Sequence, residues 1–216
     1  KKSGGVTTSH LRFGSTPIKS TYLIDEADFI ACHVPSYVKQ YDVIKGLKKG
    51  GKFVLNCPWS DAQLEEELPA HLKKYIAEND IDFYTISANK LADEIGLGSR
   101  INMIMQSGFF KLADVIPYDD AVKYLKESIV KSYGKKGQSV VDMNYKAVDM
   151  GSDGLHKVDV PAAWASLEDL KIDTTKADDP EYIKNILRPV NAQEGDSLPV
   201  STFVGREDGA VPSGAS

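Results

Sequence analysis

The stretch ADFIACHVPSYVKQYDVIKGLKKGGKFVLNC, residues 27–57, decides the fold class. It begins with a short apolar run over 27–34, which predicts a buried strand. Apolar residues at helical spacing then predict a helix over 36–48, and the glycine pair that follows is expected to end it. Residues 52–57 are typical of a second buried strand. A strand–helix–strand unit of this kind favours two parallel, neighbouring strands.

The alternation of strands and helices continues to about residue 149. Asp61 is a good N-cap for a helix that Pro69 is expected to divide in two. The further elements that we expect are a divided helix over 61–78, a strand over 81–87, helices over 88–95, 101–114, 118–132 and 137–149, and a Val- and Thr-rich strand over 6–13. This order predicts an α/β fold of three layers, with a mostly parallel sheet flanked by helices. Because only three or four strands can be counted, we expect a first strand to be missing through truncation.

The character of the sequence changes near residue 150. Prolines, aspartates and glycines become frequent over 151–216, and periodic segments become few. We therefore expect residues 1–150 to form the α/β domain and 151–216 to form an extended tail or linker towards another domain. Disorder is the alternative. The docked tail is favoured by its apolar residues Trp164, Leu167, Leu170, Ile183, Ile186 and Leu187.

Composition excludes several classes of function. The net charge of −5 argues against a nucleic-acid or anionic-membrane partner, and no apolar run approaches the roughly eighteen residues of a membrane span. Cys32 and Cys57 are the only cysteines, too few for a four-thiolate cluster, so no metal site is expected. We expect both to pack as small apolar residues, with a disulfide as the alternative. The low cysteine count suits a reducing, cytoplasmic compartment.

Two segments favour an anion. Lys1, Lys2 and Ser3 precede a glycine pair, and glycine-rich backbone with ammonium groups suits a phosphate; a frayed terminus is the alternative. Arg100 follows Gly98 and Ser99 at the expected start of a helix, where a cation opposes the helix dipole unless an anion joins it. The alternative is a local ion pair with Asp93 or Glu94. Asn102 lies in the same turn and is able to donate to a ligand.

Three further residues are candidates for a cleft or an interface. His10 and Arg12 fall on one face of the strand expected over 6–13, and His33 lies at the carboxyl end of the strand over 27–34. Open α/β sheets place ligands at such strand ends. A structural, hydrogen-bonded histidine is the commoner case. No carboxylate pair demands a general acid–base role, and no nucleophile elbow is present, so no catalytic residue is expected.

Several long strings are more specific than any of these patterns. In order and spacing they resemble the γ-type domain of pyruvate:ferredoxin (or flavodoxin) oxidoreductases, members of the 2-oxoacid:ferredoxin oxidoreductase family. The strings are KKSGGVTTSHLRFG, ADFIACHVPSY, GGKFVLNCPW, EIGLGSRINMIMQSGFFKLADVIP and YGKKGQSVVDMNYKAVD. The closing LPVSTFVGREDGAVPSGAS resembles the segment that follows this domain in the single-chain enzymes.

The resemblance implies a fragment of an enzyme that converts pyruvate and coenzyme A to acetyl-coenzyme A and carbon dioxide while reducing ferredoxin or flavodoxin. It implies coenzyme A binding at Lys1, Lys2, Ser3, Arg100 and Asn102. Thiamine diphosphate, Mg²⁺ and 4Fe–4S clusters are implied in other domains, so the isolated fragment is expected to be inactive. The expected partners are those other domains, the electron carrier, and a second copy in a homodimer. The alternatives are a non-catalytic interface scaffold of the same complex and a free-standing nucleotide-binding protein.

Overall fold

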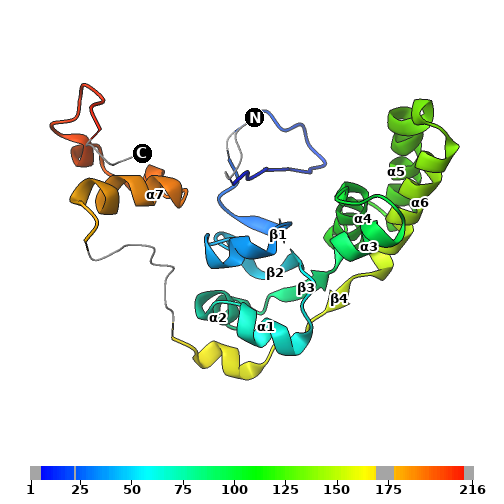
Figure 1. The fold of residues 1–216 in the computed structure, drawn as a ribbon, viewed down its shortest axis with the longest axis horizontal. Helices are drawn as coiled ribbons and strands as arrows, with labels where there is room; N and C mark the ends of the chain where they lie inside the picture. Colours follow the sequence, from blue (N-terminus) through cyan, green and yellow to red (C-terminus); the bar gives the residue numbers. More distant parts are fainter. Residues whose placement is uncertain (1–5, 22, 169–177, 212–216) are drawn as a thin grey trace.

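The protein is built around a mostly parallel sheet. The computed structural model describes residues 6–21, 23–168 and 178–211, and over these ranges it contains a four-stranded sheet in the order β1-β2-β3-β4. The strands are β1 (Ala27–Cys32), β2 (Leu47–Asn56), β3 (Asp82–Ile86) and β4 (His156–Lys157). The first three run parallel and β4 pairs antiparallel to β3 (Figure 1). The expected parallel pairing of the first two strands is confirmed.

Alternation along the strands sends side chains to two opposite layers. Phe53 of β2 lies opposite Phe83 of β3 in the register, and their rings stack with centroids 5.5 Å apart. Both are fully buried in a core that includes Leu64 and Leu72. Val54, one residue along β2, belongs instead to the second core. This follows from the two-residue period of a strand.

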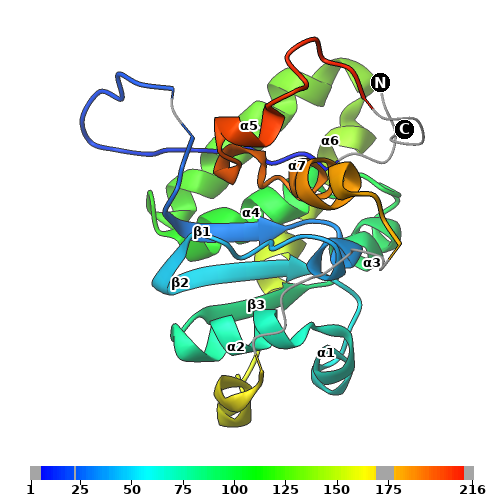
Figure 2. The same ribbon diagram turned by 90° about the vertical axis from the view of Figure 1, so that its left-hand side faces the viewer.

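Helices cover both faces of the sheet, which confirms the three-layer α/β fold (Figure 2). One face is covered by η1 (Pro35–Lys39), α1 (Asp61–Glu67), α2 (Ala70–Glu78) and η3 (Ala162–Ser166). The other is covered by α3 (Ala88–Glu94), α4 (Asn102–Ala113), α5 (Tyr118–Tyr133) and α6 (Gln138–Asp153), with η2 (Gly134–Lys136) between the last two. The C-terminal segment contains η4 (Ile183–Leu187), α7 (Arg188–Asn191), η5 (Gly195–Ser197) and η6 (Val200–Phe203). None of the helices in the described ranges is both long and apolar enough to cross a bilayer.

The helix expected over 36–48 is wrong. The structure has only the short η1, and β2 begins at Leu47, so the glycine pair Gly50-Gly51 lies inside a strand. Gly46 has a φ of +79°, and a Cβ there would lie 2.3 Å from the Asp25 carbonyl oxygen. The chain turns sharply at this glycine and passes directly into the sheet, which leaves no room for a further helical turn.

The strand expected over 6–13 is also wrong, since these residues form no regular element. Side-chain contacts, rather than pairing with a neighbouring strand, hold this segment in place. His10 Nδ1 accepts a 3.0 Å hydrogen bond from the backbone N–H of Ile24, and Arg12 donates to the Leu23 carbonyl at 2.8 Å. Phe13 stacks on Phe109 of α4 with ring centroids 5.8 Å apart. These bonds satisfy single polar groups, whereas a ladder would pair every second residue.

The start of α1 differs from expectation by one residue. Pro69 separates α1 from α2 as expected, but the N-cap is Ser60 rather than Asp61. Ser60 Oγ accepts from the Gln63 N–H, and the Gln63 side chain accepts from the Ser60 N–H at 3.0 Å. This reciprocal capping box satisfies two N–H groups at once.

A three-residue cluster holds η3 against α1 and α2. Trp164 is buried, and its indole Nε1 donates to Glu65 Oε2. Lys73 donates to Glu65 Oε1 at 2.9 Å and lies 5.8 Å from the centre of the Trp164 ring. A segment well beyond the parallel strands is thereby tied to the first helical layer.

We expect Glu65 to contribute stability that acid removes. Hydrogen bonds from Lys73 and Trp164 lower the pKa of its carboxyl below the ordinary value of 4.5. Since the folded pKa lies below the unfolded one, the contribution is complete above the unfolded value and is lost as the pH falls through the folded value. Thermal unfolding of Glu65→Gln should therefore occur below the wild-type temperature near neutral pH and converge with it in acid. A difference that stays constant to about pH 3 would contradict this.

Candidate anion-binding site

The turn between α3 and α4 is shaped by two glycines. Gly96 and Gly98 have φ values of +81° and +57°, a region that favours glycine. The Leu97 N–H donates to the Ala92 carbonyl at 2.8 Å and anchors the turn on the end of α3. Leu97 is buried, whereas Ser99 and Arg100 are exposed beside it. The turn therefore presents polar side chains to solvent from a fixed backbone.

Arg100 lies just before α4, and no counter-charge pairs with it among the residues that the structure describes. The helix begins at Asn102, its N-cap Ile101 makes no side-chain cap, and its first turn holds no acidic residue. The local ion pair with Asp93 or Glu94 is absent from the described part of the chain, where Arg100 makes no ion pair or side-chain hydrogen bond. The uncapped N–H groups at the start of α4 and the guanidinium of Arg100 therefore lie at the same end of the helix. Both attract negative charge, so this arrangement favours an anion.

Helix α4 is held firmly on the layer behind it. Ser107 Oγ donates to the Val148 carbonyl of α6 and also lies 3.1 Å from the hydroxyl of Tyr118. At the other end of α4, Lys52 of β2 donates to the Leu112 carbonyl and satisfies one of the last carbonyl groups. The start of α4 is therefore fixed relative to the sheet.

Of the other residues predicted for this site, Asn102 is among those that the structure describes. Lys1, Lys2 and Ser3 lie outside the described residues, so their approach to Arg100 stays a prediction. Asn102 is exposed in the first turn of α4, close in sequence to Arg100. The structure thus brings together only the second half of the predicted set.

His33 lies where it was expected, directly after β1, but the neighbouring polar network centres on Asn56. The Asn56 amide donates to the His33 carbonyl at 2.9 Å and to Asn89 Oδ1 at 2.8 Å, and its oxygen accepts from the Ala88 N–H at 3.0 Å. Partial desolvation lowers the pKa of the His33 imidazole, so the neutral form is favoured. Asn56 escaped the sequence reasoning, although an asparagine ending the apolar run of β2 was the available signal.

His10 and Arg12 do not share a strand face. Both side chains form hydrogen bonds with the backbone of residues 23 and 24, as described above. Their role in an interface or a cleft stays a prediction.

A shallow cavity of about 450 Å³ opens at the carboxyl end of β3. His156 of β4 and Asp61 of α1 meet across it at 2.9 Å, and Lys90 of α3 lines it without an ion pair among the described residues. Its position accords with the ligand crevices of open α/β sheets. Its lining includes Lys90 and Glu94 of α3, the helix that leads into the turn of Arg100. Among the predicted site residues that the structure describes, none lines the cavity.

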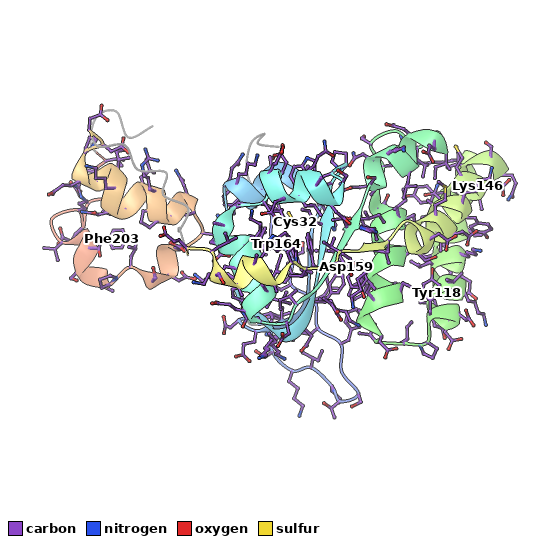
Figure 3. The ribbon with its side chains drawn as sticks, turned by 90° about the horizontal axis from the view of Figure 1, so that it is seen from below. Cys32, Tyr118, Lys146, Asp159, Trp164 and Phe203 are labelled. Atoms are coloured by element: carbon purple, nitrogen blue, oxygen red, sulfur yellow. The ribbon has the colours of Figure 1, made fainter. Side chains whose placement is uncertain are left out.

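The cysteines are poor ligands in this fold. Cys32 and Cys57 are free and buried (Figure 3 labels Cys32 within the core). Burial raises the pKa of both thiols, that of Cys57 to about 11, so neither is a thiolate near neutral pH. Among the described residues, no three His, Cys, Asp or Glu side chains gather as a metal site would require. These side chains do not fit an iron–sulfur cluster or zinc.

Comparison with known families gives two matches. The model described as pyruvate ferredoxin/flavodoxin oxidoreductase matches residues 1–154. A second model, described as a domain of unknown function, matches residues 169–216.

Two bacterial proteins are similar over essentially the whole chain. The pyruvate-flavodoxin oxidoreductase of Enterobacter agglomerans is 59% identical over 216 residues, which is 100% of this chain and 18% of that protein. The pyruvate:ferredoxin oxidoreductase of Moorella thermoacetica is 55% identical over 214 residues, which is 99% of this chain and 18% of that protein. The chain therefore spans less than a fifth of the length of these relatives.

A solved structure has a similar fold. The pyruvate oxidoreductase subunit PORC of Thermotoga maritima matches with a TM-score of 0.50 and 13% identity, over 63% of this chain and 67% of that one. At this identity the likeness concerns the fold alone.

Proposed function

Because this chain belongs to the pyruvate ferredoxin/flavodoxin oxidoreductase family, we propose that it is part of an enzyme that oxidises pyruvate. The enzyme joins the acetyl unit to coenzyme A, releases carbon dioxide and passes two electrons to ferredoxin or flavodoxin. Thiamine diphosphate, Mg²⁺ and 4Fe–4S clusters belong to other parts of that enzyme, which we propose to be a cytoplasmic homodimer. The 216-residue chain alone is then inactive.

The role that we propose for this domain is to bind coenzyme A. The observation that carries it is Arg100, an exposed guanidinium at the uncapped start of α4 without an ion pair in the described chain. Coenzyme A carries a pyrophosphate and a 3′-phosphate, and a guanidinium binds phosphate oxygens in a bidentate manner. Asn102 donates to the same ligand, and Lys1, Lys2 and Ser3 supply further positive charge and N–H groups.

These residues bind and orient, and they perform no bond-making step. Arg100 neutralises phosphate charge, while the glycine turn lets backbone N–H groups approach the ligand closely. Holding the carrier by its phosphates leaves the thiol free to reach an acyl group bound elsewhere in the enzyme. The lack of any candidate nucleophile or acid–base pair at this turn agrees with such a role.

Titration of the full-length enzyme with coenzyme A tests this proposal. Arg100→Ala and Lys2→Ala should each weaken binding by about 1.5–3 kcal/mol, the range for a hydrogen bond to a charged group, or about 10- to 150-fold in Kd. Lys19→Ala, which removes an exposed cation of the N-terminal segment, should leave the Kd unchanged. Titration with 3′-dephospho-coenzyme A then shows which phosphate each side chain contacts. A substitution that removes a contact to the 3′-phosphate should not weaken the binding of this analogue any further.

A scaffold role is the second candidate, and exposed apolar side chains favour it. Leu11, Ile18 and Leu23 are each more than half exposed in the N-terminal segment, although such residues usually pack against something. In this case the chain would hold other domains in place without contacting a ligand. Coenzyme A affinities that are unchanged in both variants would establish the scaffold and reject the binding role.

A further inference from the structure

The far end of the hairpin formed by α5, η2 and α6 is positively charged, although Asp119, Asp120, Asp149 and Asp153 at its base bring the net charge of residues 118–153 to zero. Residues 123–146 hold six lysines and two acidic residues, a net charge of +4, whereas the whole chain carries −5. The hairpin forms one end of the molecule, with Lys146 of α6 on its outer side (Figures 1 and 3). An approaching molecule therefore meets a field opposite in sign to that of the chain as a whole.

A depression of about 520 Å³ lies between α5 and α6 on this hairpin. We call it the basic groove, and it is lined by Lys123, Lys126, Glu127, Val130, Lys131 and Tyr145. Val130 is 49% exposed although it is aliphatic, and Tyr145 packs partly against the core of the helical layer. The lining thus combines two partly exposed apolar side chains with three lysines and one glutamate.

Of the three lysines that line the groove, one is held by partners within the described chain and two are not. Lys126 pairs with Asp149 at 3.2 Å and lies 5.5 Å from the centre of the Tyr145 ring. Lys123 precedes Lys126 on α5 and Lys131 follows it, and neither has an ion-pair partner among the described residues. Their charges are therefore free to meet those of a partner.

We propose that the basic groove docks an acidic protein segment that carries an apolar side chain. Carboxylates of the partner pair with Lys123 and Lys131, and its apolar side chain covers Val130 and Tyr145. Such a pairing of a small apolar centre with a charged rim is the usual anatomy of a protein interface. Charge complementarity of this kind speeds the encounter and fixes the register of the partner.

Other occupants fit the groove less well. A phosphate backbone pairs with the lysines, but it offers no apolar side chain to cover the exposed Val130. A second copy of the chain docked through the same face would set lysines against lysines, which costs free energy. The groove is distinct from the turn of Arg100, so this proposal does not depend on coenzyme A binding.

The test uses the full-length enzyme and a fluorescent helical peptide of glutamates with leucines at helical spacing. Fluorescence anisotropy should show binding that weakens as salt screens the charges over about 8–10 Å. Lys123→Glu combined with Lys131→Glu should weaken binding about tenfold or more at low salt, since two attractions become repulsions. Lys19→Glu combined with Lys90→Glu, which changes the charge equally at exposed sites elsewhere, should bind as the wild type does.

Two further probes decide between occupants. A matched peptide with alanine in place of leucine should bind more weakly, because it leaves Val130 uncovered. A DNA duplex of equal charge should bind more weakly than the leucine peptide. The proposal is overturned if the Lys123/Lys131 variant binds the peptide within about twofold of the wild type. It is equally overturned if alanine and leucine peptides bind alike, or if DNA binds more tightly than the peptide.

Discussion

Replacement of Gly151 by alanine is expected to lower the free energy of unfolding by about 2–3 kcal/mol, the cost of overpacking a close contact. A Cβ at Gly151 of α6 would lie 2.4 Å from the Ile104 carbonyl oxygen and 2.9 Å from Ser107 Cβ, both on α4. The nearest atom belongs to the backbone and cannot rotate away. The two helices must therefore move apart, which also loosens the bond from Ser107 to the Val148 carbonyl. Urea unfolding of the purified chain measures the effect.

Two other glycines provide graded controls. Gly108 faces the same contact from α4, but a Cβ there would meet its nearest atom at an ordinary 3.5 Å, so Gly108→Ala should cost less. Gly134 has a helical φ of −53° and its nearest atom at 3.9 Å. Gly134→Ala should be neutral or stabilising by up to about 1 kcal/mol through the entropy of the unfolded chain. Equal stability of Gly151→Ala and Gly134→Ala would show that α4 and α6 do not approach as described.

The sequence foretold α4 and α6 as elements but could not foretell this contact. Between residues 61 and 150, apolar periodicity agrees with breakers such as Pro69 and the glycine turn before Arg100, so the helices there were predicted within a few residues. Which faces of two helices touch depends on the crossing, which no local pattern records. A glycine in a helix suggests weak propensity, and only the coordinates reveal that Gly151 stands at the point of closest approach.

The failure over residues 36–48 has a different cause. The apolar residues at helical spacing did identify the core, since Val38, Ile44 and Leu47 are all buried. They reach it from η1, a turn and the start of β2, which happen to reproduce the spacing of a helix. Periodicity reports which residues are buried, and it predicts a helix only where no glycine such as Gly46 requires a positive φ.

The candidate site was predictable in part for the same reason. Glycines before an apolar helix placed Arg100 and Asn102 at an exposed turn, and that is where they lie. Whether Arg100 pairs with Asp93 or Glu94 depends on side-chain directions around a turn with two left-handed residues, so sequence left it open. Sequence also left open whether the segment after residue 150 docks on the domain or is disordered. The part that contains Trp164 docks, because Trp164 is part of the first core.

Trp164→Ala is expected to cost about 3–5 kcal/mol, the range for removing a buried aromatic ring. Trp164 is 3% exposed and belongs to the first core, which also contains Leu68 and Leu72. The substitution leaves a cavity and also removes the N–H that donates to Glu65. Because Trp164 is the buried side chain of η3, protease should cut near residues 159–168 faster in the variant. Urea should also unfold the variant at a lower concentration than the wild type.

Trp164→Phe separates the two contributions. Phenylalanine keeps most of the buried ring and loses the donor, so it should cost about 1.5–3 kcal/mol, the range for one hydrogen bond to a charged group. Glu65→Gln should cost no more than this, since Lys73 retains the Glu65 carbonyl as an acceptor at 2.8 Å. If Trp164→Ala unfolds with the wild type, residues 162–166 do not lie on α1 and α2. If Phe and Ala cost the same, the hydrogen bond to Glu65 rather than the buried ring holds this segment to the domain.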